Sequence, residues 1–277
     1  TMALTAVLYF VVPKGFFPLQ DTGVIQGITE ASQATSFGAM GERQQAMAEV
    51  ILKDPAVQSL SSFIGVDGAN TTLNAGRMLI NLKPKEQRDA DSRDISNVIR
   101  RITQATRLVP GIELFLQPVQ DLSIEDRIAK TQYQFLLSSP NIDELNQWTV
   151  QLLERLRALP QLADVASDIQ DKGLQAYVEI DRGAAGRLGL TVASIDNALY
   201  NAFGQRLIST IFTQSNQYRV VLEVAPAYKV GPQALNNLYV PSSNGTQIPL
   251  SSVARIVERP ASLSINHAGQ FPAATIS

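Results

Sequence analysis

The chain has 277 residues, of which 45% are hydrophobic and 17% are charged, so it is long enough for about two compact domains and too apolar for a disordered polypeptide. The absence of cysteine excludes disulfide scaffolds, thiolate metal cages and cysteine nucleophiles. Its 23 basic and 25 acidic residues give a net charge of -2 without any basic run, so we expect no nucleic-acid partner.

The N-terminal residues 2–12 form an apolar, uncharged run. This run has about half of the ~20 residues that a membrane-spanning helix requires. We interpret it as the outer end of a transmembrane helix whose start lies outside the sequence, with Lys14 as an anchor at the membrane interface. The alternative is a buried N-terminal strand.

From residue 24 onward, strand-like and helix-like patterns alternate with short connections, which favours a mixed α+β fold. The order strand, helix, strand, strand, helix, strand is that of the ferredoxin-like unit, βαββαβ or split βαβ. The expected strands are residues 24–30, 57–66, 77–82 and 112–117, and the expected helices are 36–53 and 92–108.

After a polar linker at 118–127, the pattern restarts. In the predicted helix, Asn141 is the expected N-cap, Glu144 occupies the capping-box position, and Trp148 shares an apolar face with leucines, which predicts a core tryptophan. The restart stops halfway and resumes at 262–277, where the sequence ends before the unit is complete. The expected elements are a strand at 131–137, a helix at 142–159 and a strand at 162–169.

Between these halves, residues 172–261 have the pattern of an insertion with its own core. Thr191 is the expected N-cap of a helix that Gly204 ends. Two alternating strands at 207–212 and 218–224 then predict a β-hairpin.

The sequence offers little for catalysis. His267 is the only histidine, and the common hydrolase and nucleotide-binding motifs do not occur. Asp89, Asp91 and Asp94 resemble the start of a calcium loop, but the loop glycine is missing, and we interpret them as carboxylates at a helix N-terminus. We therefore expect no catalytic residue, no metal site and no cofactor.

The loop at residues 65–76 has twelve residues and is rich in glycine, asparagine and threonine. It joins two strands, so it is not placed to hold a phosphate at a helix N-terminus. Its residues leave two interpretations open, a mobile flap beside a binding cleft or a passive surface loop.

Three segments carry a family resemblance. Residues 12–23, VPKGFFPLQDTG, contain the pattern F-x-P-x-x-D-x-G, and residues 177–189 and 195–199 are similar to the opening of a docking subdomain. Over essentially its whole length, the chain resembles the second large periplasmic loop of a resistance-nodulation-division (RND) multidrug efflux transporter, closest to the MdtB/MdtC-like branch.

This resemblance implies two ferredoxin-like porter subdomains, the second interrupted by an α+β docking insertion and truncated at its C-terminus. Residues 1–19 would be the end of a transmembrane helix and a linker, and 20–128 the first porter subdomain. Residues 129–171 plus 262–277 would form an incomplete second porter subdomain, and 172–261 the docking subdomain. The protein would lie in the bacterial inner membrane, with this region on the periplasmic side.

The resemblance also implies a mechanism. The cleft between the porter subdomains would bind amphiphilic drugs and pass them toward an outer-membrane channel by alternating access. Proton-relay membrane helices, which this sequence lacks, would supply the energy, so we expect part of a proton/drug antiporter and not an enzyme. The implied partners are a periplasmic adaptor protein, the outer-membrane channel, and either identical subunits or a related subunit in a mixed trimer.

Family positions transfer to residues of this chain as a substrate site and a switch loop. Well-known drug exporters have several phenylalanines in the pocket, whereas this chain has smaller or aliphatic residues there, which puts a stacking-rich pocket in doubt. The implied substrate-binding residues are Gln26, Ile28, Ser61, Val66, Gly68, Leu79, Glu113 and Phe115, and the implied switch loop includes Gly65, Asp67, Gly68, Asn70 and Gly76.

The main alternative is a soluble ligand-binding or sensor protein built from tandem ferredoxin-like domains, in which residues 2–12 would be a core strand. An enzyme is a distant third. The exporter interpretation is preferred because the insertion, the incomplete second unit and the uncharged N-terminal run follow from it together.

Overall fold

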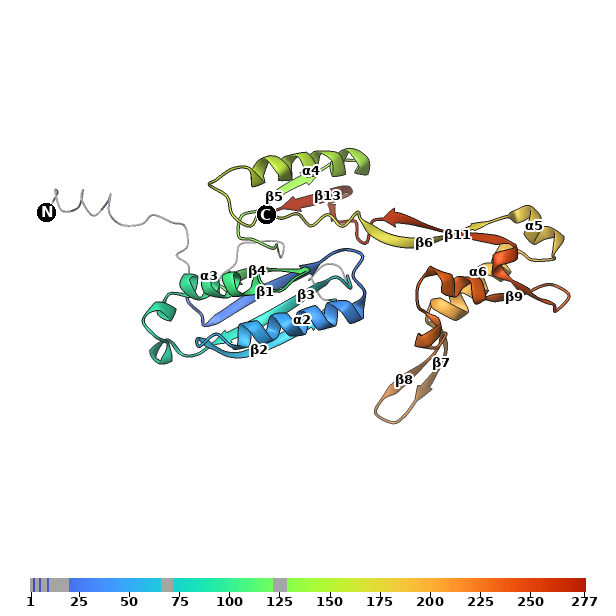
Figure 1. Cartoon of the computed structure of the whole chain (residues 1–277), viewed down its shortest axis with the longest axis horizontal. Helices are drawn as coiled ribbons and strands as arrows, with labels where there is room; N and C mark the ends of the chain where they lie inside the picture. The colour runs from blue at the N-terminus through green and yellow to red at the C-terminus, as the bar shows by residue number, and fades with distance from the viewer. Residues whose placement is uncertain (1, 3–4, 6–8, 10–19, 66–71, 122–128) are drawn as a thin grey trace. The chain divides into compact units, whose positions relative to one another are not determined.

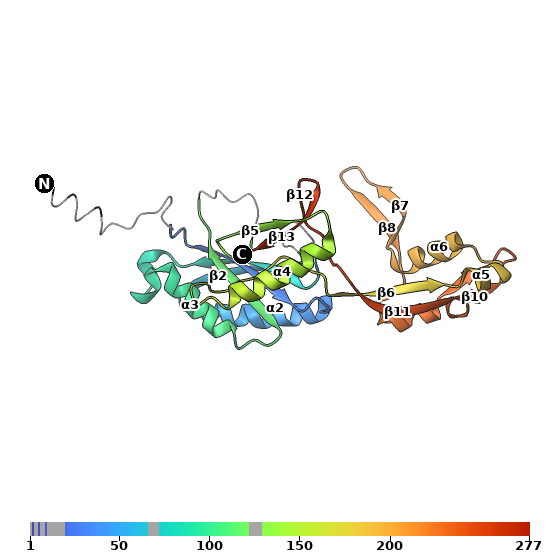
Figure 2. The ribbon, with the colours of Figure 1, turned by 90° about the horizontal axis from the view of Figure 1, so that it is seen from above.

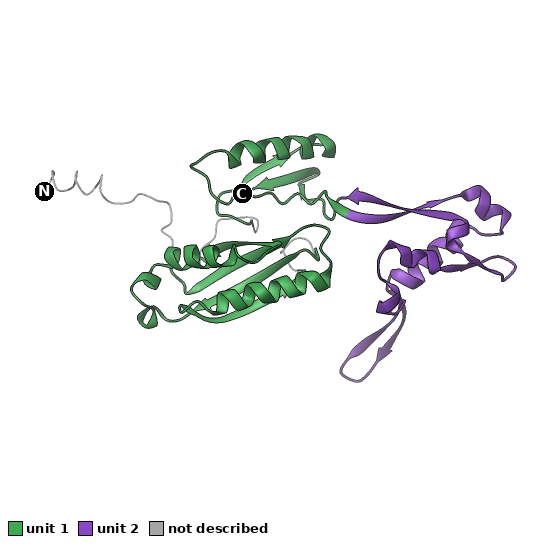
Figure 3. Cartoon of the chain, in the orientation of Figure 1, with its two compact units in different colours: residues 1–173, 262–277 green, residues 174–261 purple. Residues whose placement is uncertain are grey.

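The computed structural model describes residues 2, 5, 9, 20–65, 72–121 and 129–277 (Figure 1). The chain divides into two compact units, one formed by Thr1–Gly173 with Ser262–Ser277 and the other by Leu174–Ala261 (Figure 3). Among the helices of the described residues, none is both long and apolar enough to cross a membrane. Most of the run at 2–12 and the expected anchor Lys14 lie outside the described residues.

The first unit begins with a four-stranded antiparallel sheet in the order β2-β3-β1-β4. Its elements follow in the predicted order, with ends close to the predicted ones. They are β1 (Val24–Ala31), α2 (Phe37–Leu52), β2 (Val57–Ile64), β3 (Ala75–Leu82), the short 3-10 helices η1 (Lys85–Gln87) and η2 (Asp91–Arg93), α3 (Ile95–Thr106) and β4 (Ile112–Pro118).

Helices α2 and α3 pack on the same face of this sheet and bury an apolar core (Figure 1). The core includes Ile25 of β1, Met47 of α2, Met78 of β3 and Val98 of α3, all fully buried. A chain of three polar side chains crosses this core. The Thr29 hydroxyl donates to Gln44 Oε1 at 2.7 Å, and Gln44 Nε2 donates to Ser62 Oγ at 2.9 Å. The buried side chains of Thr29 and Gln44 are thus hydrogen-bonded to each other, as polar groups in a core usually are.

Helix α3 begins later than predicted. Asp94 is its N-cap, and the carboxylate accepts from the Ser96 amide at 2.9 Å. The preceding residues form η2, where the Ser92 amide donates to Asp89 at 2.8 Å. These carboxylates cap backbone amides, as the interpretation of helix N-terminal carboxylates expects.

The rest of the first unit has a three-stranded sheet in the order β12-β13-β5. The strand predicted at 131–137 is shorter, and the strand predicted at 162–169 is wrong. Asp164 has a positive φ of 55°, which interrupts an extended strand, and only isolated bridges such as Ser167 to Ile276 follow. The elements are β5 (Phe135–Ser138), α4 (Ile142–Arg157), β12 (His267–Ala268) and β13 (Phe271–Ile276).

Helix α4 confirms its predicted N-cap but not its predicted core tryptophan. Asn141 Oδ1 accepts from the amides of Asp143 and Glu144 at 3.0 and 3.3 Å. Trp148 is 55% exposed, because Leu145 and Thr149, one helical turn apart, are the buried positions of the helix. The apolar face is therefore narrower than the leucine pattern suggests.

The second unit is an α+β structure with a separate core around Ile195, Val240, Leu250 and Val253. Thr191 and Ser194 form a reciprocal capping box at α6, which confirms the predicted cap. The elements are β6 (Gly173–Ile180), α5 (Arg182–Arg187), α6 (Val192–Phe203), β7 (Arg206–Phe212), β8 (Gln217–Leu222), η3 (Pro226–Tyr228), η4 (Pro232–Asn237), β9 (Tyr239–Pro241), β10 (Gln247–Pro249), η5 (Leu250–Ser252) and β11 (Ala254–Ala261).

The predicted hairpin of the second unit is present as β7 and β8, which pair in antiparallel register. Within this unit the hairpin extends away from α6, α5 and the β6/β11 pair (Figures 1 and 2). The molecule is therefore a mixed α+β protein with antiparallel sheets, as the sequence predicts.

Candidate functional site

Strand alternation separates two faces of the first sheet; α2 and α3 both pack on one of them, and no helix of the described residues belongs to a core on the other. Side chains on a strand point alternately to opposite faces. Ile25, Thr29 and Ala31 of β1 point toward α2 and α3, since Thr29 bonds Gln44 of α2 and the other two belong to the core. Gln26 and Ile28 therefore lie on the opposite face.

The register of the sheet gathers further residues on that opposite face. Leu79 of β3 lies directly opposite Gln26 of β1 and Ser61 of β2, and Ile28 lies opposite Phe115 of β4. We call this surface the helix-free face and define it by Gln26, Ile28, Ser61, Phe63, Arg77, Leu79, Glu113 and Phe115.

Six of the expected substrate-binding residues thus share one surface. Val66 and Gly68 lie outside the described residues. Phe63 and Arg77 were not predicted, although each is two positions from a predicted residue on its own strand, and Arg77 lies directly opposite Phe63 and Ile28. The alternation of side chains along a strand, with a period of two residues, would have identified both residues from the sequence.

The expected switch loop is described only at its ends. Gly65 has a positive φ of 77°, and its amide donates to the Ala75 carbonyl at 2.8 Å. Near the other end, Asn74 Nδ2 donates to the Ala31 carbonyl at 3.1 Å. Asp67, Gly68 and Asn70 lie outside the described residues, and whether this loop is a switch stays a prediction.

The segment after the linker contacts the edge of the helix-free face. Lys130 forms an ion pair with Glu30 of β1 and donates to the Ser167 carbonyl at 2.6 Å. Its Nζ also lies 5.7 Å from the centre of the Phe115 ring, within the range of a cation-π contact. A cation and an aromatic ring are therefore placed together beside β4.

The surroundings of Arg77 differ from those of Lys130, which contacts a carboxylate, a backbone carbonyl and an aromatic ring. Its Nε and Nη2 atoms are buried and have no hydrogen-bond partner in the described structure. Burying unpaired donors costs free energy, so such groups call for an explanation.

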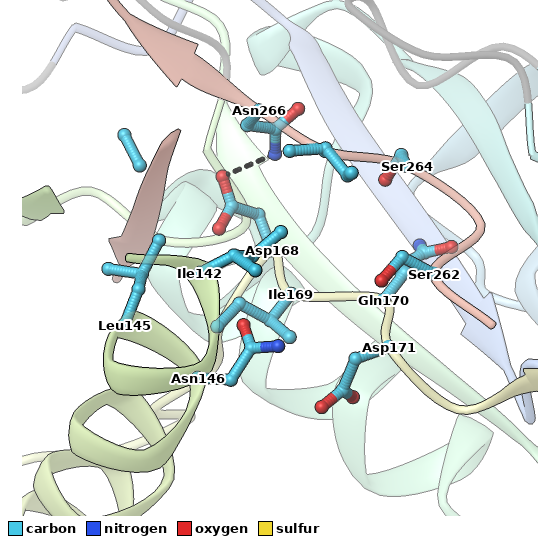
Figure 4. Close-up of a pocket in the computed structure, with 12 residues that line it drawn as sticks. Ile142, Leu145, Asn146, Asp168, Ile169, Gln170, Asp171, Ser262, Ser264 and Asn266 are labelled. Carbon is cyan, nitrogen blue, oxygen red and sulfur yellow. Dashed lines mark hydrogen bonds between the residues drawn. The ribbon is translucent and has the colours of Figure 1, made fainter. Parts of the chain in front are cut away.

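A small pocket in the first unit lies between α4 and the segments around residues 168–171 and 262–266 (Figure 4). Asn266 Nδ2 donates to Asp168 Oδ2 at 2.9 Å at its wall (Figure 4). Its volume of about 20 Å³ has room for about one water molecule. It is too small for a drug-sized ligand.

The second unit has a larger and more open depression, with a volume of about 530 Å³, between α6, the end of β8 and β9. Beside it, Lys229 pairs with Glu223 at 2.6 Å, and this contact lowers the pKa of the Glu223 carboxyl. The neighbouring hairpin exposes several large apolar side chains, namely Leu207, Ile208, Ile211, Phe212, Tyr218, Val221 and Leu222.

Residues with other potential chemistry are dispersed. His267 lies exposed in β12, and no group of three or more histidine, aspartate or glutamate side chains in the described part of the chain is placed to hold a metal ion. Asp54 binds Arg101 through two bonds of 2.6 and 2.8 Å, which raises the pKa of the guanidinium. The ion pair of Asp54 and Arg101 therefore contributes to the fold of the first unit.

Comparison with known proteins identifies the family of the chain and structures with a similar fold. The sequence model of the AcrB/AcrD/AcrF family matches residues 1–277. The chain belongs to the AcrB/AcrD/AcrF family. Two crystal structures of a heavy metal efflux pump, crystal forms I and II, match 99% of the chain with TM-scores of 0.84 and 0.83 and identities of 21% and 20%. The chain spans 29% of the length of each.

Proposed function

We propose that the chain is the periplasmic porter and docking region of a proton-driven RND efflux pump in the bacterial inner membrane. Membership of the AcrB/AcrD/AcrF family over residues 1–277 supports this proposal. The proton-relay helices would belong to other parts of the transporter, so this region would bind and move the substrate without catalysing a reaction.

The proposal includes two ferredoxin-like porter subdomains. The order β1-α2-β2-β3-α3-β4 and the sheet order β2-β3-β1-β4 support it for residues 20–128. Residues 129–171 with 262–277 would be part of the second subdomain, and 172–261 the docking subdomain. The separate core of the second unit is consistent with an inserted subdomain.

In this proposal the helix-free face is the substrate-binding surface of the first porter subdomain. Leu79 and Phe63 are exposed there beside the polar Ser61, and Phe115 is partly exposed. Exposed apolar side chains interspersed with polar ones suit amphiphilic molecules. The loop at 65–76 would act as the switch that opens and closes this surface during alternating access.

Amphiphiles suit this surface better than metal ions. The structural neighbours come from a heavy metal efflux pump, but this chain has no cysteine, one histidine and four methionines. Three of those methionines, Met40, Met47 and Met78, are fully buried on the helix side of the sheet. The soft ligands that transition metals prefer are therefore scarce on the helix-free face.

The proposed partners are a periplasmic adaptor, an outer-membrane channel, and identical or related subunits of a trimer. The exposed apolar hairpin β7–β8 supports an assembly surface, because large apolar side chains on a protruding element mark protein contacts. The alternative of a soluble sensor has only the tandem domains in its favour.

The proposal is tested by export of amphiphilic dyes from cells that carry the full transporter. Leu79→Trp should change the rates for some dyes relative to others, because it enlarges a side chain that is 40% exposed on the helix-free face. Leu188→Trp is the matched control, at 43% exposure in the second unit. Equal effects of the two variants, with equal protein levels, would argue against the assigned surface.

A further inference from the structure

An open depression lies at the end of the first sheet where the chain enters β1. Val24 at the start of β1 pairs with Asn81 near the end of β3, and Asn81 pairs with Ser59 of β2, so three strands meet at this end. The depression has a volume of about 530 Å³, which is in the range of small-molecule sites. Most of its lining side chains are polar, among them Gln58, Ser59, Asn81, Lys83, Lys85 and Arg88.

The lining of this depression carries an excess of positive charge. Asp21 supplies the one carboxylate among the described residues that line it, and Arg88 pairs with that carboxylate at 2.8 Å. Lys85 is 57% exposed, and its Nζ lies 3.9 Å from the same carboxylate, beyond hydrogen-bond distance. Lys83 donates to the Pro55 carbonyl at 2.7 Å, and none of the ion pairs between described residues includes it. Two lysine charges therefore remain for an anion, in a chain whose net charge is -2.

The donors around the two lysines suit a phosphate group. A lysine ammonium has three N–H donors, so Lys83 keeps two of them after its bond to Pro55. The Ser59 hydroxyl accepts from Asn81 Nδ2 at 3.0 Å, which leaves its own hydrogen for a ligand. The oxygens of a phosphodiester are acceptors that carry a negative charge, and lysine binds such groups as a point charge.

The length of the chain before β1 links this end of the sheet to the membrane. Seven residues, 13–19, separate the apolar run at 2–12 from Gln20, and a fully extended chain of that length spans at most about 30 Å. The sequence predicts that the apolar run is the outer end of a membrane helix. On that prediction, the covalent chain holds the depression within reach of the lipid headgroups.

We propose that this depression binds the phosphate of an anionic phospholipid headgroup, with Lys83 and Lys85 as the two cations. This inference rests on the proposed function, which places the region at the inner membrane, and it adds a site at a place other than the helix-free face. Basic side chains near an anionic lipid surface strengthen binding. A zwitterionic headgroup would bring its own cation toward the lysines and bind more weakly. Soluble phosphates have the same acceptor oxygens but no acyl chains, so the test compares both sources.

The test is a local fluorescence titration on the purified full transporter. Because the 277 residues contain no cysteine, Gln87→Cys carries the single bimane label once any cysteine elsewhere in the transporter has been replaced. Gln87 is exposed in η1, between the lining residues Lys85 and Arg88, and does not itself line the depression. Dihexanoyl-phosphatidylglycerol, kept below its micelle concentration, should change the bimane fluorescence with a Kd about ten-fold or more below that of dihexanoyl-phosphatidylcholine.

Lys83→Gln combined with Lys85→Gln should weaken binding of phosphatidylglycerol by about ten-fold or more, because two cations are lost, and should leave phosphatidylcholine nearly unchanged. Since Lys83 also bonds the Pro55 carbonyl, a second variant separates binding from folding. Ser59→Asp keeps both lysines and an acceptor for Asn81 but adds a negative charge at an exposed position. It should cause the same selective loss with an unchanged thermal midpoint.

The matched control removes two positive charges from another part of the first unit. Arg100 and Arg107 are exposed on α3 and at its C-cap. Helix α3 leads into the start of β4, which pairs with the end of β1, so Arg107 lies toward the opposite end of the sheet. Arg100→Gln combined with Arg107→Gln should change neither lipid affinity. A loss equal to that of the lysine variant would indicate diffuse attraction and overturn the site.

The other outcomes also decide. Equal weakening of both lipids by the lysine variant, weakening of neither, or a wild-type transporter that responds to neither lipid overturns the headgroup site. Inorganic phosphate or glycerol 3-phosphate acting at lower concentrations than phosphatidylglycerol would assign the depression to soluble phosphates and overturn the lipid assignment. If headgroup binding fails while Leu79→Trp alters dye export, the proposed function stands without this site. If the export assay fails while selective headgroup binding persists, the proposed role of the helix-free face is wrong and the lipid site stands.

Discussion

Asp21 and Arg88 form a buried ion pair directly before the first strand, β1, of the first sheet. Arg88 Nη1 lies 2.8 Å from Asp21 Oδ2, and the two side chains are only 2% and 8% exposed. The other carboxylate oxygen accepts from the Gly23 amide at 3.0 Å, and Arg88 Nε donates to the Lys83 carbonyl at 2.6 Å. The aspartate of the F-x-P-x-x-D-x-G pattern thus fixes the chain where it enters β1.

Asp21→Asn should destabilise the first unit by about 3–5 kcal/mol, because it leaves the buried Arg88 charge uncompensated. The matched control is Lys85→Met, which removes a cation that is 57% exposed and 3.9 Å from the same carboxylate, and it should cost less than about 1 kcal/mol. Denaturant unfolding measures both values. Equal losses would show that burial does not decide the strength of this contact.

Gly76→Ala should destabilise the protein by about 1–3 kcal/mol, the usual cost of overpacking. An added Cβ would lie 2.7 Å from the Phe63 carbonyl oxygen and 2.8 Å from both Gln44 Nε2 and Thr29 Oγ1. Gly41→Ala in α2 is the control, since its Cβ would meet only Ile64 at 4.0 Å, and it should stabilise the helix by about 0.5–1 kcal/mol. Thermal midpoints that move in the same direction would contradict this reading of the core.

The ion pair between Lys130 and Glu30 should couple two segments that are distant in the sequence. A double-mutant cycle with Lys130→Met and Glu30→Gln should give an interaction free energy of about 1–2 kcal/mol, because both side chains are mostly buried. The same cycle on Lys229 and Glu223, which are more exposed, should give a smaller interaction free energy, because solvent screens exposed ion pairs. A larger value for the second pair would be the opposite of the expectation.

The hairpin β7–β8 should matter for assembly and not for folding. Phe212→Asp combined with Tyr218→Asp replaces two exposed side chains, so the thermal midpoint should hardly change. Cross-linking of the full transporter in membranes should show fewer intersubunit products. Tyr133→Asp, at an exposed tyrosine of the first unit, serves as the control, and unchanged cross-linking in the hairpin variant would count against an assembly role.

Asp89 should contribute a pH-dependent part of the stability. Hydrogen bonds from the side chain and the backbone of Ser92 lower the pKa of its carboxyl below the ordinary value of 3.8. A lowered folded-state pKa gives stability above the ordinary value that is lost as the pH falls through the folded-state value. The difference in thermal midpoint between wild type and Asp89→Asn should therefore shrink from pH 7 toward pH 3, and a constant difference would disagree with this linkage.

The sequence by itself determined the order and approximate ends of most elements. Helix caps at Asn141 and Thr191 depend on residues within one turn, and the periods of 2 and 3.6 depend on local alternation, so both can be read without a structure. The predictions failed where contacts between residues distant in the sequence determine the local structure. The positive φ of Asp164 interrupts the strand predicted at 162–169, and the packing of α4 leaves Trp148 exposed.

Only the tertiary structure decided which side chains share the helix-free face. Residues 26, 61, 79 and 115 come from four strands, and the register between strands, not any local pattern, sets Leu79 between Gln26 and Ser61. The same holds for Arg77, whose lack of a described partner depends on where every nearby carboxylate lies. Alternation tells which way a side chain points along its own strand, whereas cross-strand pairing determines its neighbours.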